Sequence, residues 1–183
     1  MVEITIPAQE LYNEKENRFF DIQKPIKVEL EHSLLAISKW ESHFCKPFLD
    51  KKKKTKAEAI YYLKCMSLND EIPEEAFFGI SDSELKKVID YIDSPQTATV
   101  INDKARNKKG SNGETTTAEL IYYWMNECNI PKECELWHLN RLMSLIEITS
   151  IKRQPEKKMS KRDVMSSNRA LNAMRKSRTG SKG

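Results

Sequence analysis

Glycine is scarce in this 183-residue chain, and long apolar runs are missing. Its 5 glycines do not form a phosphate-binding loop of the Walker type or a dinucleotide-binding pattern. No apolar stretch approaches the roughly 20 residues that cross a bilayer. The start MVEITIPAQE alternates in polarity and does not resemble a signal peptide. We therefore expect a soluble, intracellular protein that does not cross a membrane.

The 4 cysteines and 3 histidines form no recognisable metal or catalytic motif. Cys128, Cys134 and His138 have the spacing C-x5-C-x3-H, and His43 lies near Cys45, but structural zinc sites usually present two tight ligand pairs. Cysteines in a chain without a secretion signal are expected to be reduced. A Cys134–His138 pair lacks a third, orienting residue. We predict no metal, no cofactor and no enzymatic activity.

Charge is distributed unevenly along the chain. The whole sequence has 31 Lys/Arg and 27 Asp/Glu, for a net charge of +4. Residues 151–183 contain 11 of the basic residues and 2 acidic ones, a net charge of +9, which leaves residues 1–150 at −5. This difference predicts an acidic globular body (1–150) and a basic tail (151–183) that have different partners.

The N-terminal part of the body predicts a small antiparallel sheet followed by a helix. Apolar residues alternate within 2–6, 19–22 and 26–30, as in three short strands, which must pack against helices to persist. Ser33 can cap a helix that has an apolar stripe over 34–44 and ends before Pro47. The lysine run Lys51–Lys54 is expected to be a solvated connection or to face an acidic partner.

Further helices are predicted in the rest of the body. Thr55 can cap one, and Ser81 with Glu84 has the capping-box spacing of another. A long polar loop is expected over 96–114, and then two helices, the second opened by Pro131, are expected to form an antiparallel pair at the centre of the core. On the helices after Thr55 and Ser81, the residues expected to be buried are Ile60, Tyr61, Leu63, Cys65, Met66, Leu68, Leu85, Val88, Ile89 and Ile92.

We expect the aromatic and polar residues on these helices to have structural roles and not to bind a partner. Trp40, Trp124 and Trp137 lie on apolar helical faces and are expected inside. Three polar residues are expected either on a helix surface or in a buried polar network: His138, Asn140 and Arg141.

The tail after Pro155 predicts a basic helix with a thin apolar stripe, which folds alone or on a partner. Its charge attracts phosphate, but residues 151–183 contain no aromatic residue to stack on bases, so any nucleic-acid binding is expected to be non-specific. Methionine and leucine among the charges favour a protein partner. The residues expected to contact it are Lys161, Arg162, Met165, Arg169, Leu171, Met174, Arg175, Lys176 and Arg178.

Three segments carry a resemblance to a known family. They are SLLAISKWESHFCKPFL (33–49), TAELIYYWMNECNIPKECELWHLNRLMSLIEI (117–148) and the ending KKMSKRDVMSSNRALNAMRKSRTGSKG. Together they resemble the tail assembly chaperones of long-tailed bacteriophages, over most of the chain. The resemblance implies a non-enzymatic factor that coats the helical, aggregation-prone tape measure protein and helps tail-tube subunits to polymerise around it.

From residues and resemblance together we predict an α+β fold: a small N-terminal antiparallel sheet packed on a four- to five-helix bundle, with a basic C-terminal helical tail. The expected function is that of a phage tail assembly chaperone in the host cell cytoplasm. Its expected partner is the tape measure protein, with the tail tube protein as a second candidate and homo-oligomerisation left open. The alternatives are a structural virion component at the head–tail junction or tail, and a non-specific nucleic-acid-binding protein.

Overall fold

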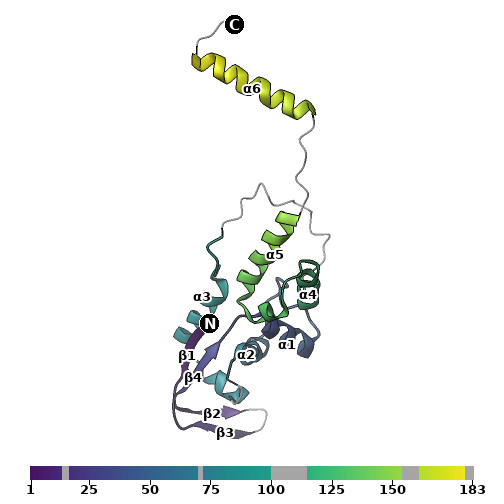
Figure 1. Cartoon of the computed structure of the whole chain (residues 1–183). Helices are drawn as coiled ribbons and strands as arrows, with labels where there is room; N and C mark the ends of the chain where they lie inside the picture. Colours follow the sequence, from purple (N-terminus) through teal and green to yellow (C-terminus); the bar gives the residue numbers. More distant parts are fainter. Residues whose placement is uncertain (14–16, 70–71, 100–114, 154–160, 180–183) are drawn as a thin grey trace. The chain divides into compact units, whose positions relative to one another are not determined.

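The computed structural model describes residues 1–13, 17–69, 72–99, 115–153 and 161–179 (Figure 1). It divides into two compact units, Met1–Ile151 and Lys152–Gly183. The first unit carries the strands at its N-terminus and is otherwise mostly helical, which confirms the predicted α+β class. Within the described residues, no helix has the length and apolar character needed to cross a membrane.

The N-terminal strands form nested antiparallel pairs and number four, where three were predicted. β1 (Val2–Ile6) pairs with β4 (Ile26–Leu30), and β2 (Gln9–Asn13) pairs with β3 (Arg18–Ile22). The alternation in β1 and β4 buries Ile4, Ile6, Val28 and Leu30 and exposes the residues between them. The prediction missed β2, because QELYN has too few large apolar residues to show the pattern.

Prolines interrupt the ladder between the two strand pairs. Pro7 and Ala8 on one side face three residues, 23–25, on the other, so the register shifts by one residue. Proline has no N–H to donate, which explains why the ladder breaks where Pro7 and Pro25 lie. The outer pair β2–β3 then contacts the 3-10 helix η1 (Glu74–Gly79), where the Gln9 side chain donates to the Gly79 carbonyl at 2.6 Å.

Helices α1 (Leu34–Phe44) and α2 (Lys56–Met66) begin at the predicted caps. The Ser33 hydroxyl accepts from the Ala36 amide, and Thr55 forms a complete capping box with Glu58. A left-handed residue, Cys45 at φ 52°, ends α1 before Pro47. After α2 the chain forms a bridge to β4 at Ser67, and Leu68 is 53% exposed, so its predicted burial is wrong.

Helix α3 (Asp82–Asp93) begins after its predicted cap, Ser81, whose hydroxyl accepts from the Glu84 amide. Its core contact is narrower than predicted. Val88 is buried, but Leu85 and Ile89 are exposed, so their predicted burial is wrong. Helix α3 packs mainly against β1. Residues 96–99 of the predicted loop have no regular structure, and 100–114 lie outside the described residues.

The segment after Thr117 differs from the predicted pair of helices. α4 (Ala118–Glu127) is capped by Thr117, but Pro131 opens a 3-10 helix, η2 (Lys132–Leu136), and α5 (Leu139–Arg153) begins only at Leu139. Residues 137 and 138 do not continue the helix, because His138 forms an antiparallel β-bridge with Ser33. The predicted central pair is therefore wrong. Helix α1 takes the central place and packs against α2, α4 and η2.

A buried carboxylate on α1 joins it to α4. Glu41, 6% exposed, accepts from the Ala118 amide at 2.7 Å through one oxygen and from the Phe48 amide at 2.6 Å through the other. Ala118 is the first residue of α4, so Glu41 supplies a negative charge at the N-terminus of a helix 77 residues further along the chain. This carboxylate fixes both α4 and the segment after α1.

We expect Glu41→Ala to destabilise the protein by about 3 kcal/mol, since it leaves two amides without their charged acceptor. Glu41→Gln retains one acceptor oxygen and should cost about half as much. Urea unfolding measures both changes. Glu119→Ala, an exposed substitution in the first turn of α4, is the control and should stay within about 0.5 kcal/mol of the parent. Equal stability of Glu41→Ala and the parent would contradict this role.

Candidate functional site

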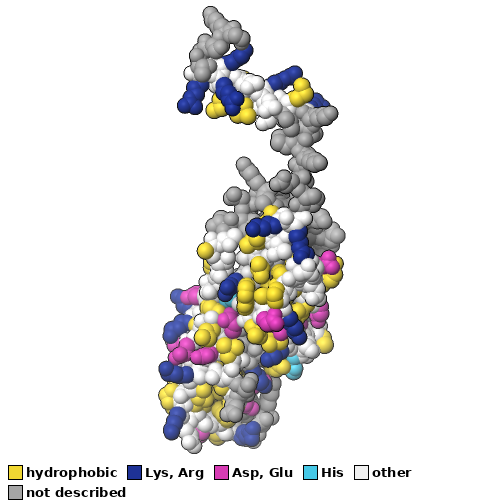
Figure 2. All heavy atoms as spheres, in the orientation of Figure 1, with side chains coloured by type: hydrophobic (Ala, Val, Ile, Leu, Met, Phe, Trp, Pro, Cys, Tyr) yellow, Lys and Arg dark blue, Asp and Glu magenta, His cyan; other side chains and the backbone are white. Residues whose placement is uncertain are grey.

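The tail residues predicted to contact a partner all fall on one helix, α6 (Lys161–Thr179). Every side chain that the structure describes on it is exposed, including Met165 at 59%, Leu171 at 47% and Met174 at 71%. Figure 2 shows dark-blue basic and yellow hydrophobic side chains of α6 at its surface. The side chain of Lys161 lies outside the described part of the chain.

Helical geometry sorts these residues into two faces. Arg162, Arg169 and Lys176 repeat every seven residues, about two turns at 3.6 residues per turn, so they share one side. Met165 lies between the first two on that same side. We call these four residues the basic face. Met165 is therefore not part of a stripe with Met174, which is nine residues away, about 2.5 turns.

Among the described side chains of α6, those of the apolar stripe on its opposite side are Leu171 and Met174, at a spacing of three. Arg178 follows Met174 by four residues and continues this side, while Arg175 lies between the two faces. Two large apolar residues are too few to hold a helix against a core. A second helix with acidic and apolar positions could contact the stripe and a neighbouring charge together.

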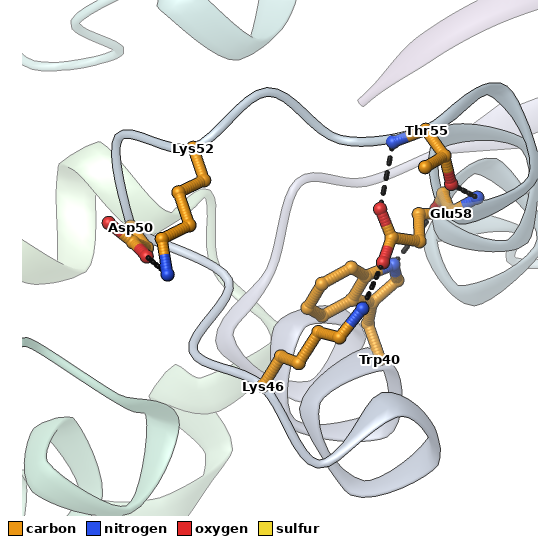
Figure 3. Close-up of polar contacts among 6 residues, drawn as sticks. All are labelled: Trp40, Lys46, Asp50, Lys52, Thr55 and Glu58. Carbon is orange, nitrogen blue, oxygen red and sulfur yellow. Dashed lines mark hydrogen bonds and ion pairs between the residues drawn. The ribbon is translucent and has the colours of Figure 1, made fainter.

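A second candidate region is a pocket of about 400 Å³ between the end of α1 and the start of α2. Figure 3 shows Trp40 from α1 together with two ion pairs, Lys46 to Glu58 at 2.8 Å and Lys52 to Asp50 at 3.8 Å. The predicted solvated lysine run thus forms part of a concave surface. The lining residues are Trp40, Lys46, Pro47, Asp50, Lys52, Lys53, Lys54, Thr55 and Glu58.

Glu58 holds one wall of this pocket together. Its side chain accepts from the Thr55 amide at 2.8 Å as well as from Lys46, and its own carbonyl accepts from the Trp40 indole N–H at 2.8 Å. The hydrogen bond from Lys46, followed by that from Thr55, lowers the pKa of Glu58 to about 2. The Glu58 carboxylate is thus ionised at neutral pH, and its two oxygens are already paired with Lys46 and with the Thr55 amide. The Thr55-x-x-Glu58 spacing in the sequence indicates this role.

Lys54 folds inward from the lysine run. Its Nζ donates to the Phe48 carbonyl at 2.7 Å and lies 4.1 Å from the centre of the Phe48 ring and 5.7 Å from that of Trp40. Burial lowers the pKa of Lys54, because desolvation penalises its charged form. In the sequence, Lys54 cannot be told apart from the other three lysines of the run. Only the folded loop shows that its side chain contacts Phe48 and Trp40.

A third region is a buried polar cluster around two histidines. His32 Nδ1 lies 2.5 Å from the Tyr62 hydroxyl, and the rings of His32 and His138 are 5.1 Å apart. His138 Nε2 contacts the Tyr91 carbonyl at 3.1 Å, and Tyr91 donates its own hydroxyl to Glu31 at 2.7 Å. The cluster joins the end of β4 to α2, α3 and the start of α5, as expected of a buried polar network.

Asn140 and Arg141 have separate structural roles beside this cluster. The Asn140 amide donates to the Ser94 carbonyl at 2.8 Å and to the Ile92 carbonyl at 3.2 Å, and so satisfies backbone groups at the end of α3. Arg141 stacks on Trp137, with its guanidinium carbon 4.1 Å from the ring centre. Of the tryptophans, Trp40 is buried as predicted, while Trp124 and Trp137 are partly buried against the core.

The cysteines that raised the question of a metal are free thiols in different environments. Cys134 is buried, Cys128 and Cys65 are partly buried, and Cys45 is exposed. Among the described residues no group of three or more Cys, His, Asp or Glu side chains is placed to hold a metal ion. Burial raises the pKa of the Cys65 thiol to about 11, so this group is protonated at neutral pH.

Comparison with family models, curated proteins and solved structures finds no match to this chain.

The histidine cluster predicts that the body loses stability in mild acid. Burial, with His138 adding to it, lowers the pKa of His32 from 6.5 to about 4, and burial also lowers the pKa of His138. His138 Nδ1 accepts from the Asn140 amide, so a proton there would remove that acceptor. The unfolded chain then binds more protons than the folded one as the pH falls below about 6.5.

Stability should thus be full above pH 6.5 and should fall by about 2 kcal/mol between pH 7.5 and pH 5 through His32 alone. Urea unfolding at the two pH values measures this. His32→Asn should flatten the dependence, whereas His43→Gln, which removes an exposed histidine, should leave it unchanged. A slope that persists in His32→Asn would contradict the assignment.

Proposed function

We propose that this protein is a non-enzymatic assembly factor of the phage tail chaperone type, and that it binds a helical partner, the tape measure protein, through α6. The observation that carries the proposal is the exposure of all the described side chains of α6, apolar ones included. Water-exposed Met and Leu on a separate unit favour contact with another molecule.

The two faces of α6 support a helical protein partner in particular. A helix that carries acidic residues beside an apolar stripe would bury Leu171 and Met174 and pair with Arg178 on the same side of α6. The basic face, on the opposite side, would contact a second acidic segment of the partner. Methionine adapts to irregular apolar surfaces, which suits a chaperone that holds many segments of a long chain. The absence of aromatic residues from 151–183 disfavours nucleic acid, because base stacking needs an aromatic surface.

The binding role of α6 predicts that R162Q/R169Q/K176Q captures the tape measure protein about tenfold more weakly than the parent. L171Q/M174Q should show a similar loss. Glutamine is a good helix former, so α6 should remain helical, which circular dichroism checks. Capture by the immobilised full chain, measured over a range of salt concentrations, provides the affinities.

The matched control is K24Q/K86Q/K132Q, which removes the same charge from exposed positions of the body and should bind as the parent does. Undiminished capture by both α6 variants would exclude α6 as the binding element. Binding of the parent to DNA, with a steep loss of affinity in salt that the α6 variant abolishes, would favour the nucleic-acid alternative.

A chaperone should be absent from finished particles. We expect mass spectrometry of purified mature virions to detect this protein at far below one copy per tail, and lysates taken during assembly to contain it. Stoichiometric copies in purified virions would instead identify a structural component of the head–tail junction or tail.

A further inference from the structure

The pocket between α1 and α2 has an excess of positive charge at its wall. Four lysines line it, Lys46 and Lys52–Lys54, against two carboxylates, Asp50 and Glu58. Glu58 is already engaged by Lys46 and by Thr55, and the other pair, Lys52 to Asp50, is long at 3.8 Å with the Lys52 side chain 90% exposed. Lys52, Lys53 and Lys54 therefore line the pocket without a tightly paired carboxylate among the residues that the structure describes.

Lys54 is the most informative of these cations. It is partly removed from water, and its direct contacts, the Phe48 carbonyl and the Phe48 and Trp40 rings, are neutral. The carboxylates of Glu58 and Asp50 attract its charge only from a longer distance. Within the described residues, no carboxylate lies within ion-pair distance of its Nζ. A partly desolvated ammonium with neutral contacts gains free energy when an anion enters beside it.

The form of the pocket favours an acidic side chain over a nucleic acid. Trp40 is 2% exposed and donates its N–H to the Glu58 carbonyl, so its ring is packed in the wall and has no open face on which a base could stack. A volume of about 400 Å³ accommodates a few side chains. The lysine ammoniums are flexible point charges that can contact carboxylates from several directions.

We propose that this pocket, which we call the lysine pocket, binds glutamate or aspartate side chains from an acidic segment of a protein partner. The choice of a protein partner rests on the proposed function, whereas the site itself is separate in sequence from α6. The protein would then contact its partner at two places, through α6 and through the lysine pocket, and two linked contacts raise the overall affinity without either being strong alone.

The test uses the full chain and a short fluorescein-labelled peptide in which glutamate and alanine alternate. Fluorescence anisotropy measures its binding in the R162Q/R169Q/K176Q background, so that the basic face of α6 does not contribute. Adding K52Q/K53Q/K54Q should weaken binding about tenfold, and adding K52Q/K53Q alone about threefold. The reason is that each exposed charge pair contributes less than a factor of ten to the dissociation constant. K52Q/K53Q alters only exposed side chains and guards against a folding defect.

The control adds K24Q/K86Q/K132Q to the same background and should leave the affinity unchanged, with thermal unfolding checked for all variants. Equal affinity of the pocket variants and this control would overturn the proposal. So would complete displacement of the peptide by inorganic phosphate at an equal concentration of charge, which would indicate a site for free anions. Tighter, pocket-dependent binding of a single-stranded oligonucleotide would overturn it in favour of nucleic acid.

The two proposals fail separately. Loss of peptide binding in the pocket variants with unchanged tape measure capture by the α6 variants would support the lysine pocket and refute the role of α6. The reverse result would refute the pocket alone.

Discussion

The rest of the body depends on the buried carboxylate of Glu41. A charge inside a protein persists only when hydrogen bonds replace the water it has lost, and here two backbone amides from separate segments do so. Ala118 is thereby fixed at the start of α4, and Phe48 is fixed just after α1. Because α1 also packs on α2 and η2, this one side chain sets the place of the central helix relative to its neighbours.

The neighbouring residue on α1 extends the same constraint towards the lysine pocket. Trp40 donates to the Glu58 carbonyl, and Glu58 in turn caps α2 and pairs with Lys46. Since Glu41 holds the Phe48 amide, the Phe48 carbonyl and ring are positioned for Lys54. The lysine pocket is therefore a consequence of how α1 and α2 are joined, and its charge arises from a loop that the core holds in place.

The body and α6 contrast in how their apolar residues are used. In the body, most large apolar residues pack together in a buried core. Figure 2 shows hydrophobic, basic and acidic side chains interspersed on the visible face of the surface. On α6 the apolar side chains that the structure describes are exposed.

The sequence alone determined the features that depend on near neighbours in the chain. Polarity alternation located β1, β3 and β4, the caps at Ser33, Thr55 and Ser81 located three helix starts, and the charge count separated the basic tail from the acidic body. These signals are local because a cap acts over three residues and a strand pattern repeats every two. The α6 candidates were likewise found from composition and spacing.

Only the tertiary structure decided which residues act across long separations. Nothing local distinguishes Glu41 from the other glutamates, because its partner at Ala118 is 77 residues away. Helix α5 begins only at Leu139 because a bridge between His138 and Ser33 competes with the helix. Leu85 and Ile89 are exposed because α3 turns Val88, and not these two residues, towards the core. Lys54 differs from its lysine neighbours only by the carbonyl and rings that folding brings to it. Burial and long-range hydrogen bonds are properties of the packed chain, and residue spacing does not record them.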